Sequence, residues 1–271
     1  FFTNRGKVYR VKGYEIPESQ RAARGTNIIN ILPIAQDEKV TAVICGKSDV
    51  DVDNAYITMV TKAGIIKRTK LSAYVNVRKS GLNAINLDEG DELKWVRLTG
   101  GEDDLVVATK NGKIIRFNEL DAREIGRTAR GVRAILLRDD DEVVGMEIVT
   151  AGTKLLTITE EGKGRRTPFD NYHLQKRGGS GVTNYSGSKV AGIKAVEDDD
   201  DIIVISSDGI IIRMSVAEIN VQSRTAGGVR AMRLGEDSRV VNFTVAPKNE
   251  DESEDASEEE TEEASETETE E

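Results

Sequence analysis

The feature that most constrains this chain is a pair of glycines that recurs five times at a nearly fixed spacing. The first member of each pair falls where a tight turn is expected, and these turn glycines are Gly6, Gly64, Gly112, Gly162 and Gly209. The second glycine follows 19 residues later in four copies and 17 residues later in the second copy. Repeats of roughly 40 to 50 residues indicate stacked units that cover one another's apolar faces.

Each repeat predicts four short β-strands. In the third copy, LVVATK and KIIRF flank Asn111-Gly112, a dipeptide that favours a two-residue type I′ hairpin. VRAILL follows Gly131, and VVGMEIV closes the unit, so we interpret each repeat as one four-stranded antiparallel sheet. In the first copy the third strand is assigned to TNIINIL, residues 26–32, and the extra length after it to an insertion, CGKSDVDVDN.

The sequence therefore predicts an all-β, propeller-like fold of about five visible blades over residues 1–247. The expected blades are about 1–47, 55–100, 104–150, 154–197 and 201–247. Residues 248–271 form a separate unit that we expect to be disordered, because this tail has no large apolar residue to offset the entropy of ordering.

The charge is divided unevenly between these two parts. The tail from Glu250 to Glu271 has 14 acidic and no basic residues, which leaves 34 acidic against 38 basic residues in the rest of the chain. A mildly basic body permits a polyanionic partner. The tail could compete with nucleic acid for the basic residues, or it could be a solubilising terminus.

Several function classes find no support in the sequence. Cys45 is the only cysteine, which is typical of a reducing compartment, and no run of apolar residues reaches transmembrane length. His173 is the only histidine, so neither a histidine metal cluster nor a Ser/His/Asp arrangement is expected. The acidic runs Asp139–Asp141 and Asp198–Asp201 coincide with predicted turns, which favours solvated turns over metal sites. We expect no catalytic, cofactor-binding or metal site in this chain.

Two columns of arginines recur at fixed positions in the repeats. The first column lies four residues after each turn glycine: Arg10, Arg68, Arg116, Arg166 and Arg213. The second column lies four residues before the second glycine: Arg21, Arg127, Arg177 and Arg224, with Val77 followed by Arg78 in the remaining copy. Equivalent positions of a propeller lie on one ring, so both columns predict a basic belt that binds DNA phosphates. The alternative is that these arginines solubilise blade edges or pair with carboxylates.

The stretch QKRGGSG, from Gln175 to Gly181, is the most unusual short segment. Lys176 and Arg177 supply positive charge, and the glycines around Ser180 would let backbone N–H groups approach a phosphate closely. The alternative interpretation is a flexible loop that happens to be basic.

These residues resemble the C-terminal domain of the DNA gyrase A protein over about residues 1–247. The resemblance rests on TNRGKVYRVKGYEIPE, TKNGKIIRF, REIGRTARGVRAI and QKRGGSG, and the acidic tail also fits. QKRGGSG is similar to the gyrase-A box, which consists of glutamine, two basic residues, two glycines, a basic residue and glycine. The matching residues are Gln175, Lys176, Arg177, Gly178, Gly179 and Gly181, whereas Ser180 replaces the basic residue. The principal box of the family lies in its first blade, which we expect upstream of this chain.

The resemblance implies a β-pinwheel, a six-bladed propeller variant that wraps double-stranded DNA without reading its sequence. It implies that the domain supports ATP-dependent negative supercoiling in an A2B2 assembly with the rest of the gyrase A protein and with the gyrase B protein. ATP and Mg²⁺ would be used by other parts of that enzyme, in the bacterial cytoplasm at the nucleoid, with no membrane partner. The alternatives are the equivalent C-terminal domain of topoisomerase IV, a protein-docking propeller and, less compatible with the residues present, a propeller hydrolase.

Overall fold

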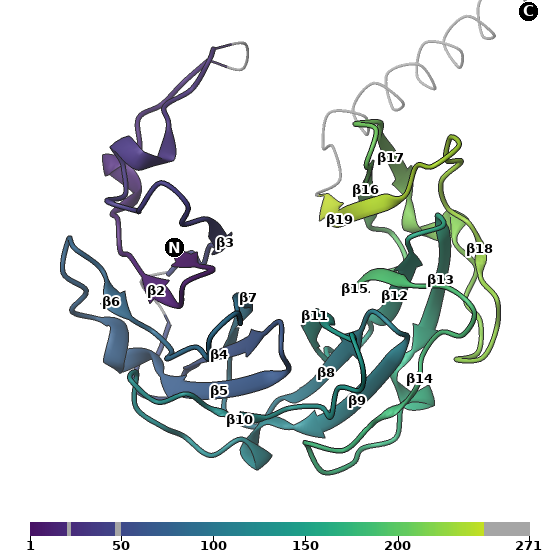
Figure 1. The fold of residues 1–271 in the computed structure, drawn as a ribbon, viewed down its shortest axis with the longest axis horizontal. Helices are drawn as coiled ribbons and strands as arrows, with labels where there is room; N and C mark the ends of the chain where they lie inside the picture. The colour runs from purple at the N-terminus through teal and green to yellow at the C-terminus, as the bar shows by residue number, and fades with distance from the viewer. Residues whose placement is uncertain (21–22, 47–49, 247–271) are drawn as a thin grey trace, which may run out of the picture.

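The computed structural model describes residues 1–20, 23–46 and 50–246, so Arg21 and the acidic tail lie outside the described residues. Nineteen β-strands form five antiparallel sheets, or blades, arranged in an arc (Figure 1). From the inner to the outer edge, blade 1 contains β3 (Val40–Ala42), β1 (Phe2–Thr3), β2 (Lys7–Val8) and β6 (Leu82–Asn83); blade 2 contains β7 (Leu93–Thr99), β4 (Tyr56–Thr61), β5 (Ile65–Lys70) and β10 (Val132–Arg133); blade 3 contains β11 (Val143–Ile148), β8 (Asp104–Thr109), β9 (Lys113–Asn118) and β14 (Val182–Thr183); blade 4 contains β15 (Val190–Val196), β12 (Lys154–Thr159), β13 (Lys163–Pro168) and β18 (Val229–Arg230); blade 5 contains β19 (Val240–Ala246), β16 (Asp201–Ser206) and β17 (Ile211–Ser215).

The outer strand of each four-stranded blade comes from the following repeat. β6, β10, β14 and β18 pair with β2, β5, β9 and β13, respectively. The interpretation that each repeat forms its own four-stranded sheet is therefore wrong, although the all-β, propeller-like fold is confirmed. Each repeat gives its third strand to its neighbour, so adjacent blades are joined by backbone hydrogen bonds as well as by side-chain packing.

The predicted two-residue hairpin is also corrected. Ala108 pairs with Ile114, and the Gly112 N–H donates to the Thr109 carbonyl at 3.0 Å, so the loop has three residues. Gly112 has φ +80°, whereas Asn111 is not among the residues with positive φ. The turn bends tightly because glycine accepts the left-handed conformation, so a type I′ turn is not needed.

Short 3-10 helices follow the second strand of each repeat, and one replaces a predicted strand. They are η1 (Gly13–Glu15), η2 (Ile28–Asn30), η3 (Leu71–Tyr74), η4 (Glu119–Asp121), η5 (Phe169–Asn171) and η6 (Val216–Glu218). η2 lies within residues 26–32, so the strand expected there is wrong. In the other copies the equivalent segment is a strand because a preceding blade pairs with it, and within the described residues no blade precedes the first.

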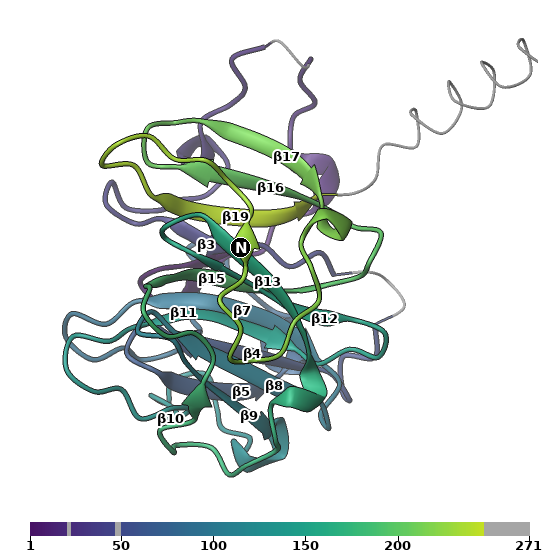
Figure 2. The same ribbon diagram turned by 90° about the vertical axis from the view of Figure 1, so that its right-hand side faces the viewer.

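The core lies between neighbouring blades, which stack face against face (Figure 2). One cluster joins Val60 and Ile66 of blade 2 to Val107 and Phe117 of blade 3. The innermost strands approach closely at Gly145, where an added Cβ would lie 2.3 Å from the Ile193 side chain. In the described part of the chain, no helix combines the length and apolar character needed to cross a membrane.

Candidate nucleic-acid interface

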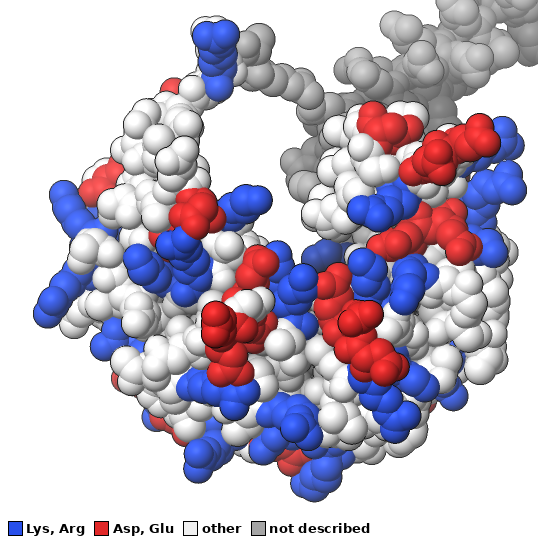
Figure 3. Space-filling view, in the orientation of Figure 1, with Lys and Arg blue, Asp and Glu red and all other residues white. Residues whose placement is uncertain are grey.

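The outer rim of the arc is built from four equivalent segments, residues 75–83, 123–133, 173–183 and 220–230, which we call the perimeter segments. Each runs from beyond a 3-10 helix through an exchanged outer strand, and Figure 1 places these strands along the outside of the arc. Glu124 is their one acidic residue. Their ten basic residues are Arg78, Lys79, Arg123, Arg127, Arg130, Arg133, Lys176, Arg177, Arg224 and Arg230. Figure 3 shows blue side chains projecting around the outer edge of the molecule.

Seven of these ten basic residues are exposed, and Arg127, Arg177 and Arg224 are half-buried. Lys176 illustrates the exposed kind: its side chain is 91% accessible and its Nζ lies 2.9 Å from the Asp121 carboxylate. Such an exposed ion pair contributes little to stability, so a phosphate could replace the carboxylate at small cost.

The first arginine column has a different position from the one predicted. Arg68 and Arg166 are only 6% and 7% exposed. The Arg68 Nε donates to the Ala122 carbonyl at 3.2 Å, and its guanidinium stacks on Tyr56. Arg166 forms an ion pair with Asp198 at 2.6 Å. The expectation that these two arginines lie on an exposed belt is wrong, because each is enclosed by the following repeat.

A shared target explains the recurrence of this column. The side chains of Arg10, Arg68, Arg116 and Arg166 donate to the C-cap carbonyls of the next repeat's 3-10 helix, which belong to Val75, Ala122, Tyr172 and Ile219. C-terminal carbonyls of a helix lack partners within it, so a cation satisfies them. Arg213 instead pairs with Asp201 at 2.7 Å. This column therefore fastens one repeat to the next.

The same column also holds the perimeter segments through its backbone. The carbonyls of Arg68, Arg116 and Arg166 accept the N–H groups of Ile125, Gln175 and Gln222 at 3.0, 2.9 and 2.8 Å. Arg116 is further fixed by Asp104, whose carboxylate lies 2.9 Å from Nη2. The arginines that sequence reasoning assigned to DNA thus form the support on which the basic rim rests.

The second column lies on the rim itself. Arg177 donates from Nε to the Asp121 carbonyl at 2.7 Å and from Nη1 to the Arg133 carbonyl at 2.9 Å. Arg224 donates to the Thr183 carbonyl, which is equivalent to that of Arg133. Arg177 and Arg224 therefore bridge neighbouring perimeter segments at half-buried positions.

The QKRGGSG loop is tied down rather than free. The Gly178 N–H donates to the Ala134 carbonyl at 2.6 Å, and the Gly179 carbonyl accepts the Leu136 N–H at 2.9 Å. Gly178 has φ +82°, and a Cβ on Gly181 would lie 2.3 Å from the Ile114 carbonyl oxygen. The glycines are required for this close packing, and the N–H of Gly178 is already used within the protein.

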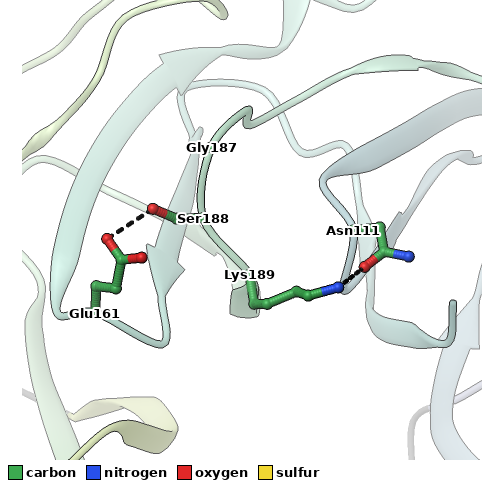
Figure 4. A pocket seen from close by; sticks show the side chains of 5 residues that line it. All are labelled: Asn111, Glu161, Gly187, Ser188 and Lys189. Carbon is green, nitrogen blue, oxygen red and sulfur yellow. Dashed lines mark hydrogen bonds between the residues drawn. The ribbon is translucent and has the colours of Figure 1, made fainter. Parts of the chain in front are cut away.

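Two other features stay outside this interface. An open polar notch of about 330 Å³ lies between blades 3 and 4 (Figure 4), where Ser188 donates to Glu161 at 2.8 Å and Lys189 contacts Asn111. In the acidic turns, Asp198 is held by Lys154 and Arg166, and these contacts, led by the Lys154 hydrogen bond, lower its pKa. Across the described ranges, no three His, Cys, Asp or Glu side chains converge as metal ligands.

Antiparallel blades with exchanged outer strands, a core between the blades and a cationic rim define a propeller-like domain of the pinwheel type. The chain belongs to the DNA gyrase C-terminal domain family, whose β-propeller model matches residues 1–47, 55–99, 103–150, 153–197 and 200–247. The resemblance stated from the sequence is thereby confirmed.

Named relatives agree with this family. The DNA gyrase A protein of Staphylococcus aureus strain MRSA252 is 40% identical over 262 residues, and the match covers 94% of this chain and 29% of the relative. The chain thus spans less than a third of the curated relatives it matches. The crystal structure of the C-terminal domain of DNA topoisomerase IV has a TM-score of 0.82 at 26% identity, covering 90% of this chain and 77% of that one. A DNA gyrase A C-terminal domain has a TM-score of 0.76 at 24% identity, covering 91% and 81%, which supports the fold alone.

Proposed function

We propose that the perimeter segments bind double-stranded DNA without reading its sequence and wrap it around the curved rim. The observation that carries this proposal is the charge of the rim, where ten basic residues face one acidic residue along a continuous outer surface. Phosphate contacts of this kind fix the path of a duplex but do not distinguish bases.

Curvature determines the energetics of wrapping. DNA has a persistence length of about 150 bp, and bending a short site costs several kcal/mol. Each neutralised phosphate releases condensed counterions, which offsets that cost in a manner that depends on salt. If about eight phosphates are neutralised, affinity should fall by about 10³ to 10⁵ between 50 and 200 mM salt.

The proposed contacts come from the exposed and half-buried rim residues, including Lys176, Arg177 and Arg224, which the sequence also predicted. Arg127 belongs to this set by its position. Arg68 and Arg166 are left out because burial keeps them from phosphates, and we assign them the supporting role described above. Gln175 and the box glycines contribute by shaping the loop.

We further propose that this domain acts within a gyrase of two A and two B chains and supplies wrapped DNA for ATP-dependent negative supercoiling. ATP and Mg²⁺ would then be bound by other parts of that enzyme, in the cytoplasm at the nucleoid. These steps rest on family membership, since the chain matches only part of each gyrase A protein.

Plasmid topology tests the proposal. Nicked plasmid is ligated in the presence of the chain, and the change in linking number is measured against protein and salt concentration. Arg78 and Lys79 are replaced together by alanine, and Lys39 and Arg239, two exposed cations outside the perimeter segments, are replaced in a matched control.

We expect a salt-sensitive linking-number change of one sign in the wild type. The rim variant should lose part of this change and lower the slope of log K against log salt by up to about 1.8, at about 0.9 per lost phosphate contact. Equal effects of the rim and control variants would reject the assignment of the rim. Salt-sensitive binding without a linking change would favour a DNA-holding domain that does not wrap, the role considered for a topoisomerase IV-like domain.

A further inference from the structure

Two basic side chains lie completely inside the domain, directly beneath the rim. Lys67 of β5 and Arg165 of β13 occupy the third position after the turn glycines of blades 2 and 4, and both are 0% exposed. Among the residues that the structure describes, neither forms an ion pair. A buried charge without a counterion is costly, so its presence calls for a physical reason.

Both cations are solvated by equivalent backbone carbonyls. Lys67 Nζ donates to the Ala84 carbonyl at 2.6 Å, and Arg165 Nη2 donates to the Asn184 carbonyl at 2.6 Å. Ala84 and Asn184 each lie three residues after the second glycine of their repeat. The inner end of each contact is therefore the same element in both blades.

The outer contact of each cation is a perimeter segment. Lys67 Nζ donates to the Arg127 carbonyl, and Arg165 Nη1 donates to the Ala226 carbonyl. Arg165 also packs its guanidinium 5.0 Å from the centre of the Tyr185 ring, whose hydroxyl donates to the Gly227 carbonyl. Each buried cation thus connects the preceding exchanged segment to the arginine-bearing segment above it.

Blade 3 achieves the same connection without a cation. Ile115 occupies the equivalent position, and the carbonyl of Ala134, equivalent to that of Ala84, accepts the Gly178 N–H at 2.6 Å. The QKRGGSG loop therefore rests directly on the blade. The comparison indicates that blades 2 and 4 do not need a charge merely to fold.

We propose that Lys67 and Arg165 are positioning residues of the DNA interface, which hold the segments of Arg127 and Arg224 and place uncompensated positive charge beneath them. Phosphates of bound DNA then serve as the counterions that the protein does not supply. This inference rests on the proposed function. A charge enclosed by protein is screened less by salt than an exposed lysine, so it acts on a polyanion over a longer range.

The titration of Lys67 provides a specific signature. Burial, together with the positive charge of Arg127, lowers the pKa of Lys67 to about 8. The other titratable group that faces it is Tyr74, whose hydroxyl donates to the same Ala84 carbonyl and whose pKa is raised by burial to about 12, so it stays neutral. A nearby phosphate favours the ammonium form, so DNA binding should raise the pKa of Lys67 and take up protons.

The sign of the effect follows from linkage. Affinity that depends on the Lys67 ammonium is present below pH 8 and is lost as the pH rises through the pKa of the bound state. If DNA raises the pKa by one unit, affinity falls about sevenfold between pH 7 and pH 9.5. A second measure is proton uptake, obtained from binding enthalpies in buffers of different ionisation enthalpy.

The experiment uses the full chain with a fluorescent duplex of about 150 bp, one persistence length. Wild type is compared with Lys67→Arg, which keeps a permanent charge, with Lys67→Met, which removes it, and with Lys39→Met as a surface control. We expect the affinity of wild type and the control to fall with pH, the Lys67→Arg variant to lose this fall and its proton uptake, and Lys67→Met to bind more weakly at pH 7.

Thermal unfolding of every variant separates binding from folding. If Lys67→Met fails to fold, the comparison of wild type with Lys67→Arg still decides the matter. Identical pH profiles and proton uptake in wild type and Lys67→Arg would overturn the inference while leaving DNA binding intact. Absence of DNA binding by wild type at every pH would overturn the proposed function and this inference with it.

Discussion

Replacing Gly112 by alanine tests how much the exchanged strand stabilises a blade. Gly112 lies in the turn between β8 and β9 with φ +80°, and its carbonyl accepts the N–H groups of Asn184 and Tyr185 at 2.8 and 3.1 Å. An added Cβ would lie 2.0 Å from the Tyr185 carbonyl oxygen, so the segment from the next repeat must move away.

The chain contains a matched control in Gly209. This residue occupies the same turn of blade 5 with φ +83°, but no atom lies within 4 Å of its added Cβ. Both alanine variants incur the strain of a left-handed residue, about 1–2 kcal/mol. Only Gly112→Ala also loses two backbone hydrogen bonds, which adds about 1–3 kcal/mol.

Urea unfolding followed by circular dichroism measures the total loss, and hydrogen exchange locates it. We expect Gly112→Ala to be less stable than Gly209→Ala by about 1–3 kcal/mol. The amides of Asn184 and Tyr185 should exchange faster in Gly112→Ala alone. Equal stability of the two variants, with unchanged exchange at these amides, would refute the conclusion that the turn glycine anchors the exchanged strand.

Further predictions concern charge. Arg68→Met should reduce the free energy of unfolding by about 3–5 kcal/mol, because it breaks a buried network, while the exposed Arg78→Met should change stability little and instead lower DNA affinity; urea unfolding and anisotropy together check this pair. Burial disfavours the Glu142 carboxylate, but hydrogen bonds and charges from Lys62 and Lys110 outweigh this and lower its pKa below 4.5. Glu142 therefore stabilises the fold above its unfolded pKa, and this contribution is lost as the pH falls through the folded value. Glu142→Gln should lose that part of the acid sensitivity, and a Tm that declines between pH 6 and pH 3 as steeply as in the wild type would contradict this.

The comparison of the two arginine columns shows what a repeated position can mean. A residue recurs in each repeat either because a shared surface needs it or because each joint between repeats needs it. The carbonyls of Val75, Ala122, Tyr172 and Ile219 place the first column in the second category. The charge of the rim comes instead from perimeter segments whose basic residues vary in position from repeat to repeat.

Much of the fold could be predicted from the chain alone. The spacing of the turn glycines predicts the number of repeats, because a left-handed turn residue is a local requirement. Strand identity follows from local runs such as KIIRF, and the acidic composition of residues 250–271 separates the tail from the body. These properties depend on neighbouring residues in the sequence, so the sequence by itself determines them.

Only the tertiary structure decides which blade receives each third strand, since a two-residue strand such as Val132–Arg133 carries no local mark of its partner. The same holds for burial: Arg68 and Arg78 are both arginines of one repeat, yet one is enclosed and the other is exposed because the following repeat covers only the first. Lys67 went unnoticed for a related reason, because its charge becomes unusual only when other segments exclude water and counterions from it.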